Sequence, residues 1–154
     1  MLKKNYNVTV FRKGTGENHV CLVSHGNLAE GLHDTLTMFM GNCEGVMHMT
    51  LKQGEAVDQF QVRCTEMLKT LGEEDEVIVL SDLIGGSPLT TFLNALSDLG
   101  KTPLIVLGGM NLAMALNALL NKDQEASIIR DICLREAADA IKEFVLSTDE
   151  DEGI

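Results

Sequence analysis

Aromatic and basic residues are both scarce in this sequence. It has no tryptophan, one tyrosine and five phenylalanines among 154 residues, so aromatic side chains make up 4% of the chain. Few rings are therefore available to stack against a flavin or a nucleic-acid base. The 12 Lys and Arg residues are outnumbered by 23 Asp and Glu, which gives a formal charge of −11. Because nucleic-acid binding needs clustered cations to displace counterions from phosphates, we expect no nucleic-acid partner.

Long apolar runs and export signals are also missing. No run approaches the roughly 20 residues that a membrane-spanning helix needs, and "MLKKNYNVTVF" at the start lacks the continuous apolar core of a signal peptide. The four cysteines lie far apart without a C-x-x-C pair: Cys21, Cys43, Cys64 and Cys133. In a chain without an export signal, they are expected to be reduced thiols, most of them packed as small hydrophobic residues. We therefore expect a cytoplasmic protein.

The length of the chain fits one domain with a single core. Both prolines suit a compact domain, since one would begin a helix (Pro88) and the other a strand (Pro103). We expect residues 1–18 to be an N-terminal extension, either an edge strand or a leader. Residues 19–146 would form the domain, and "STDEDEGI" over 147–154 would be a solvated acidic tail.

Strand-like and helix-like segments alternate along the domain. Short apolar, β-rich runs occupy 19–23, 46–51, 76–80 and 103–107, and each is followed by apolar residues at helical spacing. This alternation predicts a doubly wound α/β fold, with a mostly parallel sheet and helices on both faces. The last helical stripe would run from Ile128 to Phe144, and "AIKEFVLS" at its end could instead form an antiparallel edge strand.

The loops after the strands carry the residues most suited to chemistry. In open α/β sheets, ligands bind beyond the carboxyl ends of the strands. His25 follows the first strand and Asp82 follows the third. A carboxylate that accepts a hydrogen bond from Nδ1 would fix the imidazole tautomer and leave a lone pair on Nε2. The two residues together predict a nucleophile at neutral pH.

The loop "GGSP" adds features that suit an anion. Gly85 and Gly86 would allow close approach of the backbone, and Ser87 would be the N-cap of a helix with Pro88 at its first position. Free N–H groups at a helix N-terminus favour phosphate. Taken alone, this loop is equally typical of an ordinary tight turn, and its placement opposite His25 is what makes it a candidate phosphoryl site.

Several other kinds of site do not fit. The sequence lacks a Walker loop, a dinucleotide fingerprint after the first strand, and the G-x-S-x-G of serine hydrolases. The four histidines, His19, His25, His33 and His48, show no ligand spacing along the chain, so we expect no metal and no cofactor. His48 lies within a strand and is expected to be a partly buried, hydrogen-bonded side chain.

The motifs "LVSHG", "LSDLIGGSP" and "GGMN", each at a strand end, resemble the IIA domain of the mannose-family phosphoenolpyruvate-dependent sugar phosphotransferase system (PTS). The similarity runs from about His19 to Phe144. It implies that His25 accepts a phosphoryl group from HPr and passes it to a IIB component for sugar uptake. Asp82 would orient His25, and Ser87 would contact the phosphoryl oxygens. The surrounding pocket would include Ser24, Gly26, Gly85, Gly86 and Asn111.

The resemblance also implies a homodimer in which a C-terminal strand crosses to the neighbouring subunit. Contact with a membrane would occur only through IIC and IID partners. Three alternatives remain open on the residues alone. They are a IIA-like module whose phosphorylation controls a transcription regulator, a dihydroxyacetone kinase phosphotransfer subunit, and a flavodoxin-like module that holds a phosphorylated ligand without covalent transfer.

Overall fold

The computed structural model describes residues 16–147, and their strands and helices alternate as the sequence predicts. The proposed edge strand around Tyr6, Val8 and Val10 lies outside these residues, as does most of the acidic tail. The elements are β1 (Asn18–His25), α1 (Leu28–Met40), β2 (Val46–Leu51), α2 (Val57–Leu68), β3 (Glu76–Ser81), α3 (Ser87–Asp98), β4 (Ile105–Gly108), α4 (Leu112–Asn121) and α5 (Ala126–Asp139).

The four strands form one parallel sheet in the order β2-β1-β3-β4. The chain first moves from β1 to β2 on one side, then crosses back so that β3 pairs with the other side of β1. The direction of winding therefore changes between β1 and β3. In open α/β sheets this switch point is where ligands bind.

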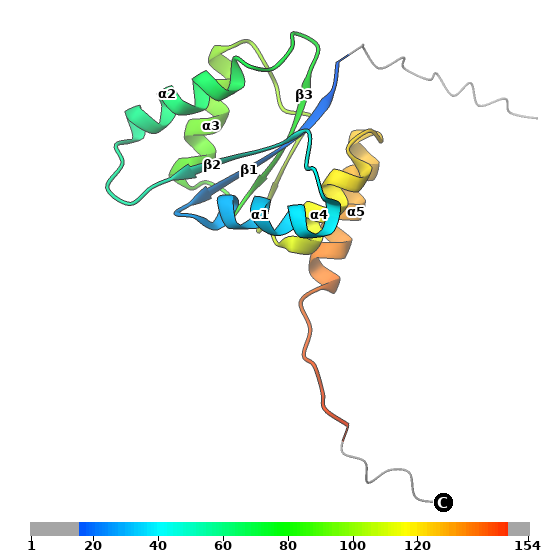
Figure 1. Ribbon diagram of the computed structural model, residues 1–154. Coiled ribbons are helices and arrows are strands. Elements are labelled where there is room, and N and C mark those ends of the chain that lie inside the picture. The colour runs from blue at the N-terminus through cyan, green and yellow to red at the C-terminus, as the bar shows by residue number, and fades with distance from the viewer. Residues whose placement is uncertain (1–15, 148–154) are drawn as a thin grey trace, which may run out of the picture.

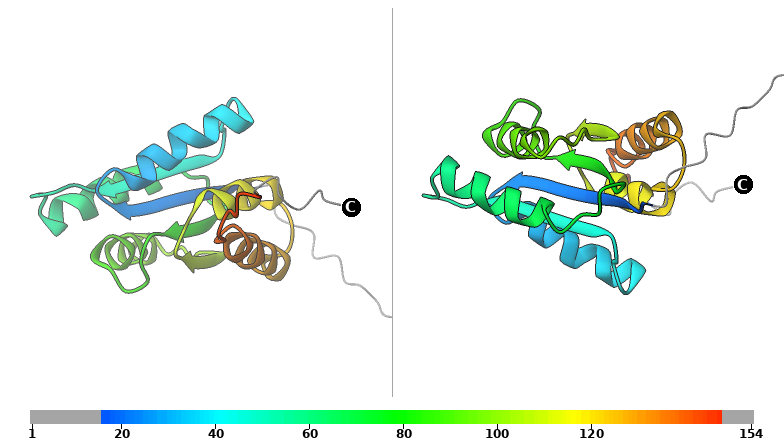
Figure 2. Two further views of the ribbon diagram at one scale, coloured as in Figure 1. Left: turned by 90° about the horizontal axis from the view of Figure 1, so that it is seen from below. Right: turned by 90° about the horizontal axis from the view of Figure 1, so that it is seen from above.

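Helices cover both faces of the sheet, which confirms the doubly wound fold (Figure 1). In Figure 1, α2 and α3 lie above the strands, and α1, α4 and α5 lie below. Figure 2 views these two helical layers in turn. Alternate residues of β1 serve the two layers: Val20 and Leu22 pack in the core with α1, α4 and α5, whereas Cys21 and Val23 pack in the core with α2 and α3.

All four cysteines are free and buried, as expected for packed thiols. Cys43, which has fewer apolar neighbours in the sequence, is buried as well. Burial raises the pKa of the Cys133 thiol to about 11, and burial is also the main cause that raises the pKa of the Cys64 thiol to about 12. These thiols are therefore protonated and unreactive near neutral pH.

Two elements begin or end differently from the prediction. β1 continues through His25, whose backbone pairs in register with Leu51, so the imidazole belongs to the last residue of the strand. α3 begins at Ser87, and its N-cap is Gly86 in an extended conformation without a side-chain cap. The prediction of Ser87 as the N-cap was thus wrong by one residue, because the backbone is already helical at Ser87.

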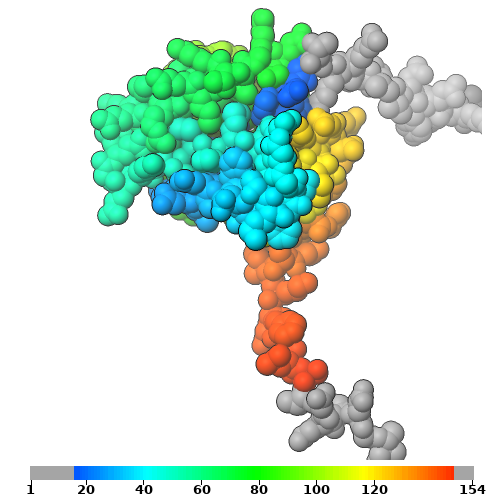
Figure 3. All heavy atoms as spheres, viewed as in Figure 1, coloured from blue at the N-terminus to red at the C-terminus, as the bar shows by residue number. Residues whose placement is uncertain are grey.

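The C-terminal segment forms neither the predicted helix extension nor the predicted edge strand. α5 ends at Asp139, and residues 141–147 have no regular structure. The buried positions of α5 are Ile129, Cys133 and Ala137, and beyond them the chain leaves the body of the protein, where it has no surface to pack against (Figures 1 and 3). Among residues 16–147, no helix combines the length and apolarity required to cross a bilayer.

Candidate functional site

His25 and Asp82 come together at the carboxyl edge of the sheet. β1 and β3 are adjacent and parallel, with Val23 in register with Ser81. The residues that follow therefore emerge side by side at the switch point. The His25 Nδ1 atom lies 2.9 Å from Asp82 Oδ2. The predicted juxtaposition of an imidazole and a carboxylate is thus present in the structure.

The Asp82 carboxylate is fixed by backbone donors as well as by the ring. The N–H of His25 donates to Oδ2 at 2.9 Å, and the N–H of Leu83 donates to Oδ1 at 2.8 Å. One carboxylate oxygen therefore binds both the backbone and the side chain of His25. This arrangement sets the χ angles of both residues and leaves little freedom for the ring to rotate.

The charge state of Asp82 determines the tautomer of His25. Burial is the largest single influence on this carboxyl group and opposes ionisation, but the hydrogen bonds from His25 and Leu83 together outweigh it and lower the Asp82 pKa. An ionised carboxylate can only accept hydrogen bonds, so Nδ1 of His25 carries the proton. In the neutral ring, Nε2 then keeps a free lone pair. The imidazole is 46% exposed, whereas Asp82 is only 14% exposed.

The Nε2 edge of the ring lies against the N-terminus of α3. A Cβ atom placed on Gly86 would be 2.9 Å from His25 Cε1 and 3.5 Å from Nε2. Only a glycine allows the ring to lie this close to the start of the helix. Gly85, with φ of +78°, turns the chain into α3. A group bonded to Nε2 would therefore lie beside a helix N-terminus, which favours negative charge.

Ser87 occupies the first position of α3, next to Gly86, and its side chain is exposed. Within residues 16–147, its hydroxyl group has no hydrogen-bond partner. It is thus free to bind a group at the helix N-terminus, and its contact with phosphoryl oxygens stays a prediction.

Three other predicted pocket residues contribute to the scaffold around the site. Gly26, with φ of +55°, makes the turn after His25, and its N–H donates to Leu51 O. The buried Ser24 hydroxyl accepts a hydrogen bond from the N–H of Ala29 at 2.8 Å, which fixes the start of α1. Asn111 is the N-cap of α4 through the N–H of Met114, and its amide donates to Ala137 O. These contacts shape the loops near His25.

The sequence did not reveal how β4 supports the Asp82 loop. The N–H of Gly109 donates to Asp82 O at 3.2 Å. A Cβ atom on Gly108 would lie 2.3 Å from Cγ1 of Ile84, so the Ile84 side chain lies directly on that glycine. The sequence does place two consecutive glycines, Gly108 and Gly109, at the end of β4. Because glycines permit such close packing of two loops, this pair could have indicated the contact.

Comparison with known proteins identifies the family. A family model described as "PTS system fructose IIA component" matches residues 19–132. The fructose-specific EIIA component of the PTS of Bacillus subtilis is 25% identical over 100 residues, which cover 65% of this chain and 67% of that protein.

Two solved structures share the fold. The EIIA phosphotransferase component of Streptococcus agalactiae has a TM-score of 0.68 and 26% identity, and the match covers 82% of this chain and 96% of that one. The mannose/sorbose-specific IIA subunit of Enterococcus faecalis has a TM-score of 0.73 and 23% identity, covering 86% and 98% respectively, and this likeness concerns the fold.

The doubly wound sheet and the matching family model together define a phosphotransfer type of protein. The chain belongs to the family of fructose and mannose-type PTS IIA components. Proteins of this family are phosphotransfer proteins of sugar phosphotransferase systems.

We expect Asp82→Asn to lower the stability of the protein by about 1–2 kcal/mol near neutral pH, because charge-assisted hydrogen bonds to His25 and Leu83 are lost. The folded-state pKa of Asp82 lies below its ordinary value. Its stabilising contribution is therefore complete above the unfolded pKa of about 3.9 and is lost as the pH falls through the folded value. Denaturant unfolding of both proteins at several pH values measures this, and a stability gap that does not shrink in acid would contradict it.

We expect Gly86→Ala to displace the His25 ring while the backbone stays intact, since the φ of −74° at Gly86 suits alanine. The new Cβ would clash with Cε1 of the ring. Gly31→Ala in α1 is the matched control, because a Cβ there meets nothing within 4 Å. Ring ¹⁵N chemical shifts of His25 should change in Gly86→Ala and stay the same in Gly31→Ala. Unchanged His25 signals in both variants would show that the ring does not lie on Gly86.

Proposed function

We propose that this protein is a phosphocarrier of a sugar PTS, in which His25 accepts a phosphoryl group from phospho-HPr and passes it to a IIB component. The observation that carries the proposal is the 2.9 Å bond between His25 Nδ1 and Asp82 Oδ2, with the Nε2 edge of the ring at the N-terminus of α3. Family membership supports a phosphocarrier role in general, with HPr and IIB components as partners.

The first transfer begins with the lone pair of Nε2. It attacks the phosphorus atom of the donor, so that an Nε2–P bond forms while the bond between phosphorus and the donor breaks and its electron pair returns to the donor. The proton on Nδ1 stays in place. The imidazole ring then carries positive charge, which the Asp82 carboxylate offsets at hydrogen-bond distance. The second transfer reverses these steps toward the IIB acceptor.

The start of α3 would bind the phosphoryl oxygens. The first N–H groups of a helix have no partner within the helix, and here the first helical hydrogen bond is donated by Thr90 to Gly86 O. The N–H of Ser87 precedes it, and the exposed Ser87 hydroxyl lies beside it. Donors placed in advance stabilise the charge that spreads over the equatorial oxygens during in-line transfer.

The exposure of the site suits transfer between proteins. A carrier must present the same atom to two partners in turn, and the His25 ring is nearly half exposed at the rim of the sheet. Leu83 and Ile84, on the adjacent loop, are also mostly exposed and would bury apolar surface when a partner protein docks. We infer that residues 19–146 form the carrier unit, that it works in the cytoplasm, and that it reaches a membrane only through IIC and IID partners.

The relay predicts an acid-labile phosphoryl adduct when the protein is incubated with phosphoenolpyruvate, Enzyme I and HPr. His25→Ala should abolish the adduct. Asp82→Ala should slow its formation by about 10²-fold or more, because the tautomer and orientation of the ring are no longer fixed. His19→Gln is the matched control, since His19 lies about 20 Å away at the other end of β1, and it should be labelled normally.

Two outcomes would contradict the proposal. Normal labelling of His25→Ala would exclude His25 as the acceptor. An adduct that forms but is not transferred to any IIB component supplied would exclude a carrier role and favour a regulatory module. Circular dichroism of each variant separates loss of chemistry from loss of fold.

We also propose a homodimer in which residues 141–147 pair with β4 of the neighbouring subunit. β4 is an edge strand of the described sheet. The segment carries Ile141, Phe144, Val145 and Leu146, each at least 74% exposed in the single chain. Figure 3 shows the segment projecting from the body. Burying these four side chains would contribute about 1.5–3 kcal/mol each.

Sedimentation equilibrium tests the dimer. The full chain and a variant that ends after Ser147 should both be dimers, whereas a variant that ends after Ala140 should be a monomer with an unchanged circular dichroism spectrum. Phe144→Asp should weaken the dimer without shortening the chain. A dimer that persists without residues 141–147 would place the interface elsewhere.

A further inference from the structure

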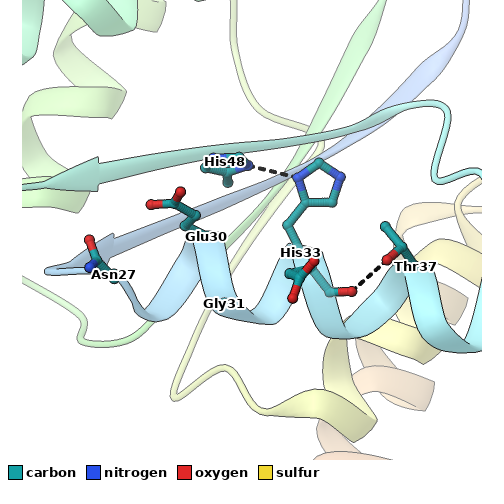
Figure 4. A pocket seen from close by; sticks show the side chains of 7 residues that line it. Asn27, Glu30, Gly31, His33, Thr37 and His48 are labelled. Carbon is teal, nitrogen blue, oxygen red and sulfur yellow. Dashed lines mark hydrogen bonds between the residues drawn. The ribbon is translucent and has the colours of Figure 1, made fainter.

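Two histidines outside the His25–Asp82 pair face each other across a groove between α1 and β2, which extends to Asn27, two residues after His25. His33 is on α1 and His48 is on β2, and their Nδ1 atoms are 2.7 Å apart (Figure 4). The ring planes are tilted by 57°. One Nδ1 must donate a proton to the lone pair of the other, because two protonated nitrogens would repel each other at this distance. The two ring nitrogens thus point toward each other across the groove.

The surroundings of the pair favour a cation. The open groove has a volume of about 490 Å³, and its lining includes the carboxylates of Glu30 and Asp34. Glu30 precedes His33 by three residues, so both lie on one face of α1. Figure 4 shows the Glu30 carboxylate directed from the helix toward the strand that bears His48.

We propose that this groove binds a divalent transition-metal ion of the class that prefers imidazole, through Nδ1 of His33 and Nδ1 of His48. The Glu30 carboxylate would supply a third ligand, and water would complete the coordination. Among residues 16–147, no three His, Cys, Asp or Glu side chains are already grouped to hold a metal. The site therefore has two nitrogen ligands in position, and the flexible, exposed Glu30 side chain must turn to join them.

The two imidazoles could exchange the hydrogen bond between them for bonds to a metal ion. The metal would take the place of the proton that one ring donates to the other, and that ring would take up a proton on Nε2, so both imidazoles would stay neutral. A Zn–N distance of about 2.0–2.1 Å in tetrahedral geometry requires the two nitrogens to be about 3.3 Å apart. The two Nδ1 atoms, now 2.7 Å apart, would have to separate to that distance for the ion to bind.

A bound ion would join a helix to a strand. α1 begins three residues after His25, and a metal between His33 and His48 would hold this helix against β2. Because the ion binds only when both elements are in place, it would stabilise the folded protein by RT ln(1 + c/Kd), where c is the concentration of free Zn²⁺, and so raise the melting temperature as c rises above the dissociation constant. This effect is independent of phosphoryl transfer.

Titration of the untagged chain with Zn²⁺, followed by long-range ¹H–¹⁵N spectra of the imidazoles, tests the proposal. The chain has only four histidines, so each ring can be assigned. The Nδ1 signals of His33 and His48 should shift, whereas those of His19 and His25 should not. Each of His33→Gln and His48→Gln should weaken Zn²⁺ binding by at least about tenfold and remove the rise in melting temperature.

The carboxylate ligand has its own test and control. Glu30→Gln should weaken Zn²⁺ binding severalfold, and Glu66→Gln, an exposed Glu on α2, should leave it unchanged. Equal affinity in Glu30→Gln would remove Glu30 from the site. The proposal is overturned if the His33 and His48 rings do not respond to millimolar Zn²⁺, or if both histidine variants bind it like the unmodified protein. Should His48→Gln fail to fold, His33→Gln decides the outcome, because its side chain lies at an open groove.

Discussion

The hydrogen bond between the His25 ring and Asp82 is the interaction on which the candidate site depends. It decides which ring nitrogen bears the proton, and it directs the other toward the N-terminus of α3. The carboxylate can do this only because two backbone N–H groups hold it in place and favour its ionised form. In the proposed transfer, the nucleophile is thus prepared by groups that never touch the reacting phosphorus.

The sheet supplies the rigidity that this bond requires. β1 and β3 lie side by side at the centre of the sheet, and each is packed on both faces by helices. Motion of one strand end relative to the other would break the contacts of two cores at once. The loops beyond these strands are then braced by β4, through Gly109 and the packing of Ile84 on Gly108. A partly exposed imidazole can therefore keep a defined orientation at the rim of the molecule.

Much of this could be predicted from the sequence. The alternation of β-rich runs with helical stripes predicted the elements of the domain, and His25 and Asp82 were correctly expected to meet. Local patterns were less reliable at element ends. Ser87 has the chemistry of an N-cap, yet Gly86 takes that position, because the backbone is already helical at Ser87. The stripe that seemed to continue to Phe144 ends at Asp139, since the helix has no surface to pack on beyond Ala137.

By itself, the sequence determined which residue types end each strand and which face of each helix is apolar, because both properties depend on spacing along a few turns. The tertiary structure alone decided which strands became neighbours, and hence that Asp82 reaches Nδ1 of His25 and that His33 meets His48. Those contacts join residues that are 57 and 15 positions apart. They form through crossover connections and helix packing, whose outcome depends on burial across the whole domain. No periodic pattern in the sequence near either residue indicates them.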